Sequence, residues 1–174
     1  MIKSKASLYI ITSIIVISVL TGCSLVSEEE ALADAHEVAA KTFKQETIET
    51  NTDLEHFSLY LPAGFEVTDE TQSNLILEND DQTYILFYNA LEDTTSELNY
   101  QAAATGGNST LLESFDDEDR FGYIKVLAIE EHNYELQVGV GGVKITTHTS
   151  KGKLKENSEE MMSMATSIAY TSQN

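Results

Sequence analysis

The chain has few residues that could form covalent cross-links or restrict the backbone. Its 174 residues include one cysteine, one proline and no tryptophan. A single cysteine cannot form a disulfide bridge within the chain, so the fold must be held by its buried core. Basic residues are also scarce, because 10 lysines and arginines face 29 acidic residues and leave a net charge of −19. A field of that sign repels phosphate groups, which argues against nucleic acid and anionic lipid head groups as partners.

Long apolar runs are absent except near the N-terminus, where the pattern is that of an export signal. Lys3 and Lys5 precede an apolar stretch at residues 8–20. This stretch is too short to span about 30 Å of hydrocarbon comfortably, which favours a signal peptide. An uncleaved N-terminal anchor is the alternative.

The apolar stretch ends in the run Leu20-Thr21-Gly22-Cys23. This run resembles the lipobox of bacterial lipoproteins. The resemblance implies that a signal peptide of residues 1–22 is removed and that the thiol of Cys23 carries a diacylglyceryl group, whose two acyl chains hold a protein stably at a membrane. We therefore expect a lipid-anchored protein at the outer face of the cytoplasmic membrane of a Gram-positive bacterium. A plain signal peptide followed by a stray cysteine is the alternative.

Removal of residues 1–22 would take away two lysines and no acid, so the net charge would become −21. Residues 23–27 would then form a short tether with a reach of roughly 14 Å at most. Residues 28–174 show no repeat, linker or change in composition, and they are expected to form one domain. Their acidic surface either keeps an exported protein soluble or serves as a face for cations or a basic partner.

Amphipathic helices are expected at both ends of this domain. Residues 27–30, Ser-Glu-Glu-Glu, form a capping box, and the apolar stripe behind it predicts a leading helix over residues 28–48. A second apolar stripe predicts a closing helix over residues 155–169. Asn157, with Glu160 three positions later, is expected to cap that helix.

Apolar runs between turn signals predict strands, with one further helix at residues 94–104 among them. The strands are expected at residues 57–61, 74–78, 82–89, 109–115, 121–130, 134–140 and 143–149. Two of these segments, 82–89 and 121–130, are apolar on both alternating faces and should be covered on both sides. A two-glycine turn joins the last two strands and sets their register, with Val138 opposite Ile145 and Glu135 opposite His148.

These elements predict an α+β fold, in which a mainly antiparallel, twisted sheet of about six to seven strands lies between helices. Residues 57–65, Phe-Ser-Leu-Tyr-Leu-Pro-Ala-Gly-Phe, resemble the opening of Mog1/PsbP-like proteins, and the closing helix looks like theirs too. The resemblance covers the order of elements over residues 57–170, although Phe65 stands where that family often has tryptophan. Because most members are binding or assembly modules, the resemblance implies the same fold and a non-enzymatic role.

No catalytic or cofactor motif is found, since the chain lacks G-x-S-x-G, H-E-x-x-H and P-loop patterns. Lipidation would also remove Cys23 as a nucleophile. No metal site is predicted, because the four histidines have no ligand spacing; they are His36, His56, His132 and His148. Glu135 and His148 are expected to form an exposed cross-strand pair. The run Asp116-Asp117-Glu118-Asp119 lacks the glycine and distant glutamate of a calcium loop, so a solvated loop is expected and cation binding stays open.

The leading hypothesis is a non-enzymatic, membrane-anchored lipoprotein that binds a protein or another envelope ligand. The alternatives are a hydrolase that uses carboxylates and a histidine, and a cation-responsive module that works through the acidic surface. An enzyme should show a deep pocket with convergent titratable groups of shifted pKa. A binding module should show a shallow groove or an exposed apolar patch.

Overall fold

The computed structural model describes residues 26–46 and 48–171, and it has the expected α+β architecture. The helices of the described part are α2 (Glu28–Phe43), α3 (Leu98–Thr105) and α4 (Leu154–Thr171), the last preceded by a short 3-10 turn, η1 (Lys151–Lys153). The strands are β1 (Thr52–Asp53), β2 (Ser58–Leu59), β3 (Phe65–Glu70), β4 (Asn74–Asn79), β5 (Gln82–Tyr88), β6 (Leu111–Asp116), β7 (Phe121–Glu130), β8 (Asn133–Val140) and β9 (Val143–Ser150).

Seven of the strands form one antiparallel sheet in the order β3-β4-β5-β9-β8-β7-β6. The sheet therefore joins two meanders, β3 to β5 and β6 to β9, through the pairing of β5 with β9. Strands β1 and β2 form a separate two-stranded sheet beside α4. The backbone N–H of Tyr60, just after β2, donates a hydrogen bond to Ser167 Oγ on α4 at 2.9 Å.

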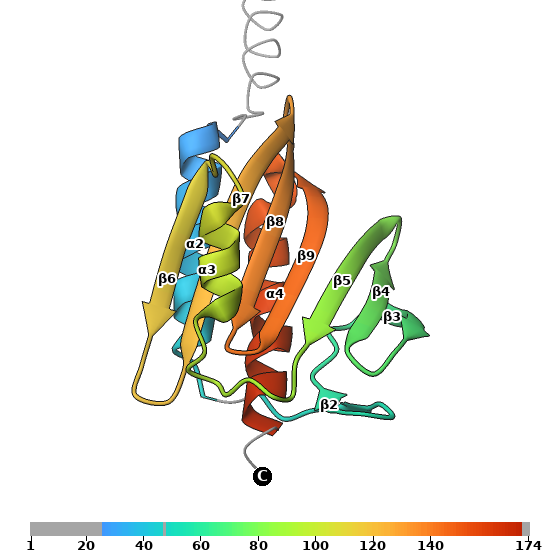
Figure 1. Ribbon diagram of the computed structural model, residues 1–174. Helices are drawn as coiled ribbons and strands as arrows, with labels where there is room; N and C mark the ends of the chain where they lie inside the picture. Colours follow the sequence, from blue (N-terminus) through green and yellow to red (C-terminus); the bar gives the residue numbers. More distant parts are fainter. Residues whose placement is uncertain (1–25, 47, 172–174) are drawn as a thin grey trace, which may run out of the picture.

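Helices cover both faces of the large sheet, as the sequence predicts. Helices α2 and α4 pack side by side on one face, and α3 lies on the other (Figure 1). The small side chains of Ala35 and Ala39 let α2 approach its neighbours closely, and both are fully buried. On the opposite face Lys125 of β7 is buried and donates to the carbonyl oxygen of Ala103 at 2.8 Å, which satisfies the end of α3.

The predicted register of the β8–β9 hairpin is confirmed residue by residue. Val138 pairs with Ile145, and Glu135 pairs with His148. Gly141 in the two-residue turn has φ +52°, a conformation that glycine adopts without steric cost. The hairpin is buried on the α4 side and partly open on the other, as its alternation predicts.

The expectation that two strands are covered on both sides is only half right. The first half of β7 is covered on both faces, because Tyr123 and Lys125 are buried beneath α3 while Ile124 is buried on the opposite face, but its last residues are exposed. In β5, Tyr84 and Leu86 are buried but Ile85 is 50% exposed. Helix α3 spans only eight residues and covers the β6–β7 side of the sheet, so the face of β5 beside Ile85 is left without a helix.

Several boundaries differ from the predicted ones for local reasons. Ser27 is confirmed as the N-cap of α2, since the backbone N–H of Glu30 donates to Ser27 Oγ at 3.1 Å, but α2 ends at Phe43 rather than residue 48. The next position of the apolar stripe, three residues beyond Phe43, is occupied by Glu46, which is charged and exposed. The strand expected at residues 57–61 shrinks to β2. Helix α3 starts four residues late, because Asp93 accepts from the backbone of Thr95 in a local turn that competes with the helix.

Two strands were not predicted at all. Strand β1 has two residues, too few to show an alternating pattern. Strand β3 is an edge strand in which only Phe65 is buried, and its exposed polar residues carry no alternating apolar signal. Both strands are held by pairing with a neighbour rather than by a buried face of their own.

Candidate functional site

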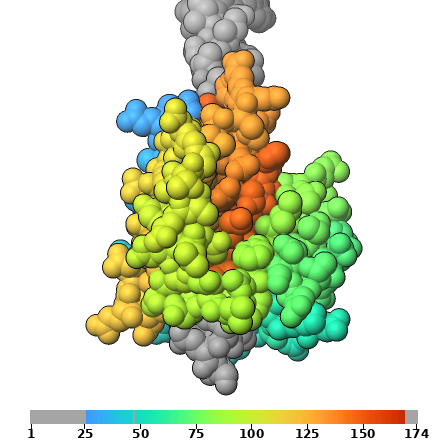
Figure 2. All heavy atoms as spheres, in the orientation of Figure 1, coloured from blue at the N-terminus to red at the C-terminus, as the bar shows by residue number. Residues whose placement is uncertain are grey.

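A cleft of about 970 Å³ opens where β5 and β9 separate. Their ladder ends at the pair Tyr84 and Thr147, after which β9 continues to Ser150 while the tip of the β4–β5 hairpin turns away. The divergence of the two strands is visible in Figure 1, and in Figure 2 a notch separates the green hairpin from the orange surface of β9. The tip of the β7–β8 hairpin and the first turns of α4 complete the walls.

The floor of the cleft is a network of buried polar side chains centred on Asn157. Asn157 is 3% exposed, and its Nδ2 donates to the hydroxyl of Tyr84 at 2.8 Å. Its Oδ1 accepts from Thr149 Oγ1 at 2.5 Å and from Gln82 Nε2 at 3.1 Å. Gln82 Nε2 also donates to Thr147 Oγ1 at 3.0 Å, so amides and hydroxyls bridge β5, β9 and α4 where the backbone ladder has ended.

This arrangement corrects the prediction that Asn157 caps the closing helix. Helix α4 begins three residues earlier, at Leu154, and η1 leads into it without a break. Asn157 therefore lies inside the helix, where its side chain is free to bond across to the sheet. An asparagine followed by a glutamate at the third position is typical of a helix start, which is why the sequence pattern pointed to the wrong role.

Carboxylates surround the network. Glu156 and Glu160 come from one face of α4, and Asp80, Asp81 and Glu130 come from the two hairpin tips. Burial, followed by the charge of Glu156, raises the pKa of Glu160, although a hydrogen bond with Asn157 opposes this. Burial, followed by the charges of Glu160 and Glu156, also raises the pKa of the Tyr84 hydroxyl. The cleft is thus a region of negative potential with a neutral, hydrogen-bonding floor.

One lysine balances part of this charge. Lys153 Nζ lies 2.6 Å from Glu156 Oε2 in an exposed ion pair. Apolar surface is present as well, because Ile85 and Ile129 both line the cleft and are 50% and 46% exposed. The cleft therefore combines carboxylates, one ammonium group and two exposed branched side chains.

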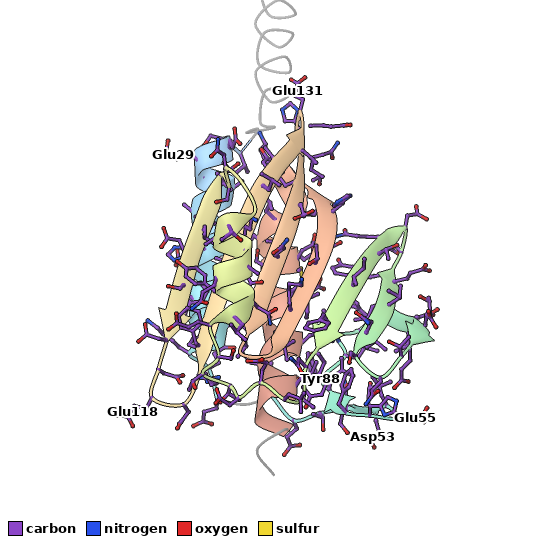
Figure 3. All side chains as sticks on the ribbon, in the orientation of Figure 1. Glu29, Asp53, Glu55, Tyr88, Glu118 and Glu131 are labelled. Carbon is purple, nitrogen blue, oxygen red and sulfur yellow. The ribbon has the colours of Figure 1, made fainter. Side chains whose placement is uncertain are left out.

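The cleft lies at the end of the fold where α2 begins. Glu130 and Asn133, which line it, flank the tip of the β7–β8 hairpin, and Tyr134 follows directly. Burial, and then a hydrogen bond with Glu28, raise the pKa of Tyr134, so the first turn of α2 touches this hairpin. Figure 3 shows Glu29 and Glu131 at this end of the molecule and Glu118 at the opposite end. The first turn of α2 and the cleft therefore lie at the same end of the domain.

The lipobox residues Leu20, Thr21 and Gly22, with Cys23 as the lipid site, lie outside the residues that the structure describes. The signal peptide and most of the tether fall there too. Among the described helices, none is long and apolar enough to cross a membrane.

The predicted cross-strand pair of Glu135 and His148 is present, with 3.9 Å between Oε2 and Nε2 and a largely exposed imidazole. His148 also lines the cleft, which its spacing in the sequence did not indicate. His36 stacks on Phe115 with ring centroids 5.6 Å apart. In residues 26–46 and 48–171, no group of three or more His, Cys, Asp or Glu side chains is placed to hold a metal ion.

The acidic run in the β6–β7 loop contains an internal ion pair. Arg120, 5% exposed, donates to Asp117 Oδ2 from Nε at 3.0 Å and from a terminal nitrogen at 2.5 Å, while its guanidinium lies 4.6 Å from the centre of the Phe43 ring. Asp117 Oδ1 also accepts from the backbone N–H groups of Asp119 and Arg120. One of the four carboxylates is thus part of the fold rather than of a solvated loop.

We expect Asp117→Asn to destabilise the fold by about 1–2 kcal/mol at pH 7, because it removes a charged partner from a buried guanidinium. Burial acts to raise the pKa of Asp117, but the hydrogen bonds from Arg120 and the backbone together lower it. A carboxyl group whose pKa is lowered by folding stabilises the protein fully at pH values above its pKa in the unfolded chain, which is about 4. This stabilisation is lost as the pH falls through the pKa that the group has in the folded protein. Urea denaturation of the wild type and of Asp117→Asn should therefore show the difference in unfolding free energy at pH 7. This difference should become smaller below about pH 4. Glu118→Gln, an exposed neighbour, is the control, and an equal loss in it would contradict the assignment.

Comparisons with known proteins add little to this site. No family model matches the chain, and no curated protein matches it. The chain is similar to a protein from Bacteroides thetaiotaomicron VPI-5482, known from a crystal structure at 1.50 Å resolution, with 13% sequence identity and a TM-score of 0.37. The match covers 63% of this chain and 44% of that one, so the chain spans less than half the length of that protein.

Proposed function

We propose that this protein is a bacterial lipoprotein anchored through Cys23 at the outer face of the cytoplasmic membrane, and that its domain binds an envelope ligand in the cleft between β5 and β9. The observation that carries the proposal is the cleft itself, whose polar floor is built from three separate elements. Its volume of about 970 Å³ is at the upper end of the range for small-molecule sites. A non-enzymatic role agrees with the resemblance to Mog1/PsbP-like modules, which stays a prediction.

The place of the cleft supports the link between anchor and ligand. Ser27, the N-cap of α2, lies four positions after Cys23, so the tether reaches roughly 14 Å at most. The end of the domain at which α2 begins would therefore stay close to the membrane. Because the cleft is lined by the β7–β8 hairpin tip at that same end, a ligand present at the cell surface would meet the open side of the sheet.

Photo-crosslinking in living cells tests this proposal. A benzophenone amino acid replaces Thr83, an exposed residue that lines the cleft, or Glu118 at the far end of the domain. We expect adducts, identified by mass spectrometry, from position 83 and none from position 118. Equal adducts from both positions, or none from either in a protein that reaches the membrane, would overturn the proposal.

A hydrolase remains the second candidate, because Glu156, Glu160 and His148 line one cleft and the pKa of Glu160 is raised. A carboxyl group that keeps its proton longer than usual can act as a general acid beside an ionised one. The two candidates differ in what happens to the ligand. A binding module returns the captured ligand chemically unchanged, whereas an enzyme would return a hydrolysed product from the wild-type protein and the intact ligand from Glu160→Gln.

A further inference from the structure

We infer that the ligand of this cleft is a small organic cation of the alkylammonium class, with an apolar stem and at least one primary ammonium group. The inference rests on the proposed function and adds the class of ligand. It follows from three features of the cleft: the sign of its charge, the placement of its apolar surface, and the side chain that already occupies part of it.

The charge of the lining excludes anionic ligands. Five carboxylates line the cleft, from Asp80, Asp81, Glu130, Glu156 and Glu160, against the single ammonium of Lys153. Below this rim the amides and hydroxyls around Asn157 are bonded to one another, so the floor is neutral. A zwitterionic lipid head group fits poorly, because its phosphate would meet the aspartates of the β4–β5 tip.

A bare metal ion fits poorly as well. The described residues hold no group of three or more ligating side chains that could bind one. The carboxylates come instead from α4 and two hairpin tips, spread around a space far larger than an ion. An extended molecule can reach several of these groups at once, whereas an ion cannot.

The apolar part of the lining suits the stem of such a molecule. Ile85 and Ile129 are exposed on the walls of the cleft. Exposure of such apolar side chains to water is unfavourable. Methylene groups of a ligand would remove part of this surface from water while the ammonium remains beside the carboxylates. Carboxylates and apolar walls together select an alkylammonium over both an inorganic cation and a neutral sugar.

Lys153 shows that the cleft accepts this chemistry, since its side chain is itself an alkylammonium and its Nζ lies 2.6 Å from Glu156. Glu160 has no ion pair of its own among the described residues, and burial, followed by the charge of Glu156 beside it, raises its pKa. An incoming ammonium would relieve that repulsion. Lys153 would compete with it for Glu156.

The test is calorimetric titration of the purified full-length protein with 1,6-diaminohexane, and with 1,6-hexanediol as a neutral ligand of the same length. The diamine should bind with one-to-one stoichiometry and the diol should not. The double variant Glu156→Gln, Glu160→Gln should weaken binding by about tenfold or more, while Lys153→Gln should strengthen it by a few-fold. Glu159→Gln removes one carboxylate and Lys155→Gln one ammonium group from exposed parts of α4 outside the cleft, and each should change the affinity by less than about twofold.

The controls separate a built site from general attraction to an acidic protein. If Glu159→Gln and Lys155→Gln shift the affinity as much as the cleft variants do, or if the diol binds as well as the diamine, the alkylammonium assignment is wrong. Thermal melting of each variant shows that it is folded. Adducts at position 83 without diamine binding would overturn this inference and leave the proposed function standing.

Discussion

Replacing Cys23 with alanine is expected to abolish the incorporation of labelled fatty acid and to move the protein out of the lipid-anchored membrane fraction. Each methylene group of an acyl chain contributes about 0.8 kcal/mol to membrane affinity, so loss of two chains removes the lipid anchor. The measurement is metabolic labelling with palmitate, followed by fractionation of the cells.

Ser24→Ala is the matched control, since it changes the neighbouring residue and leaves the thiol in place. It should be labelled as well as the wild type. Label that enters the Cys23→Ala protein, or that never enters the wild type, would contradict the lipoprotein assignment and the position of the cleft relative to the membrane.

The second large effect is expected at the floor of the cleft, where Asn157→Ala should reduce the free energy of unfolding by about 2–4 kcal/mol. The substitution takes one partner from the Tyr84 hydroxyl and one from Thr149 Oγ1, and both residues are buried. Stranding a buried polar group costs about 1–3 kcal/mol, and the better helix propensity of alanine returns only about 0.5 kcal/mol. Urea denaturation monitored by circular dichroism measures the change.

Asn108→Ala makes the same chemical change at an exposed site and should alter the unfolding free energy by less than about 0.5 kcal/mol. If Asn157 only capped a helix end, its replacement by alanine would cost about 0.5–2 kcal/mol, less than the loss expected from the buried network. A loss in Asn157→Ala no larger than in the control would mean that the network contributes nothing to the junction of β5, β9 and α4.

The sequence predicted best those elements whose pattern is local. The register of β8 and β9 follows from one two-glycine turn and an unbroken alternation, and every pair agrees with the structure. Strand β7 also has its predicted bounds, because its ten residues carry apolar side chains on both alternating faces, which is typical of a strand. The sheet and its helical cover follow from these elements, since strands with buried faces require layers on both sides.

The candidate site could not be predicted, because it depends on contacts between distant segments. Gln82, Thr149 and Asn157 meet only once β5 has paired with β9 and α4 has folded back over both. Asn157 even carried a misleading local signal, that of a helix cap. Likewise, nothing local distinguishes β5 from a strand covered on both faces, since Ile85 is exposed because α3 lies over β6 and β7 rather than over β5 (Figure 1).

Hydrogen–deuterium exchange of the full-length protein, measured with and without a soluble extract of the cell envelope, tests the central claim most directly. If the cleft is the ligand site, exchange should slow in residues 79–85 and 146–157 and stay unchanged in β3 and in the β6–β7 loop. Slowing confined to β3 or to that loop, with the amides around the cleft unaffected, would contradict the account.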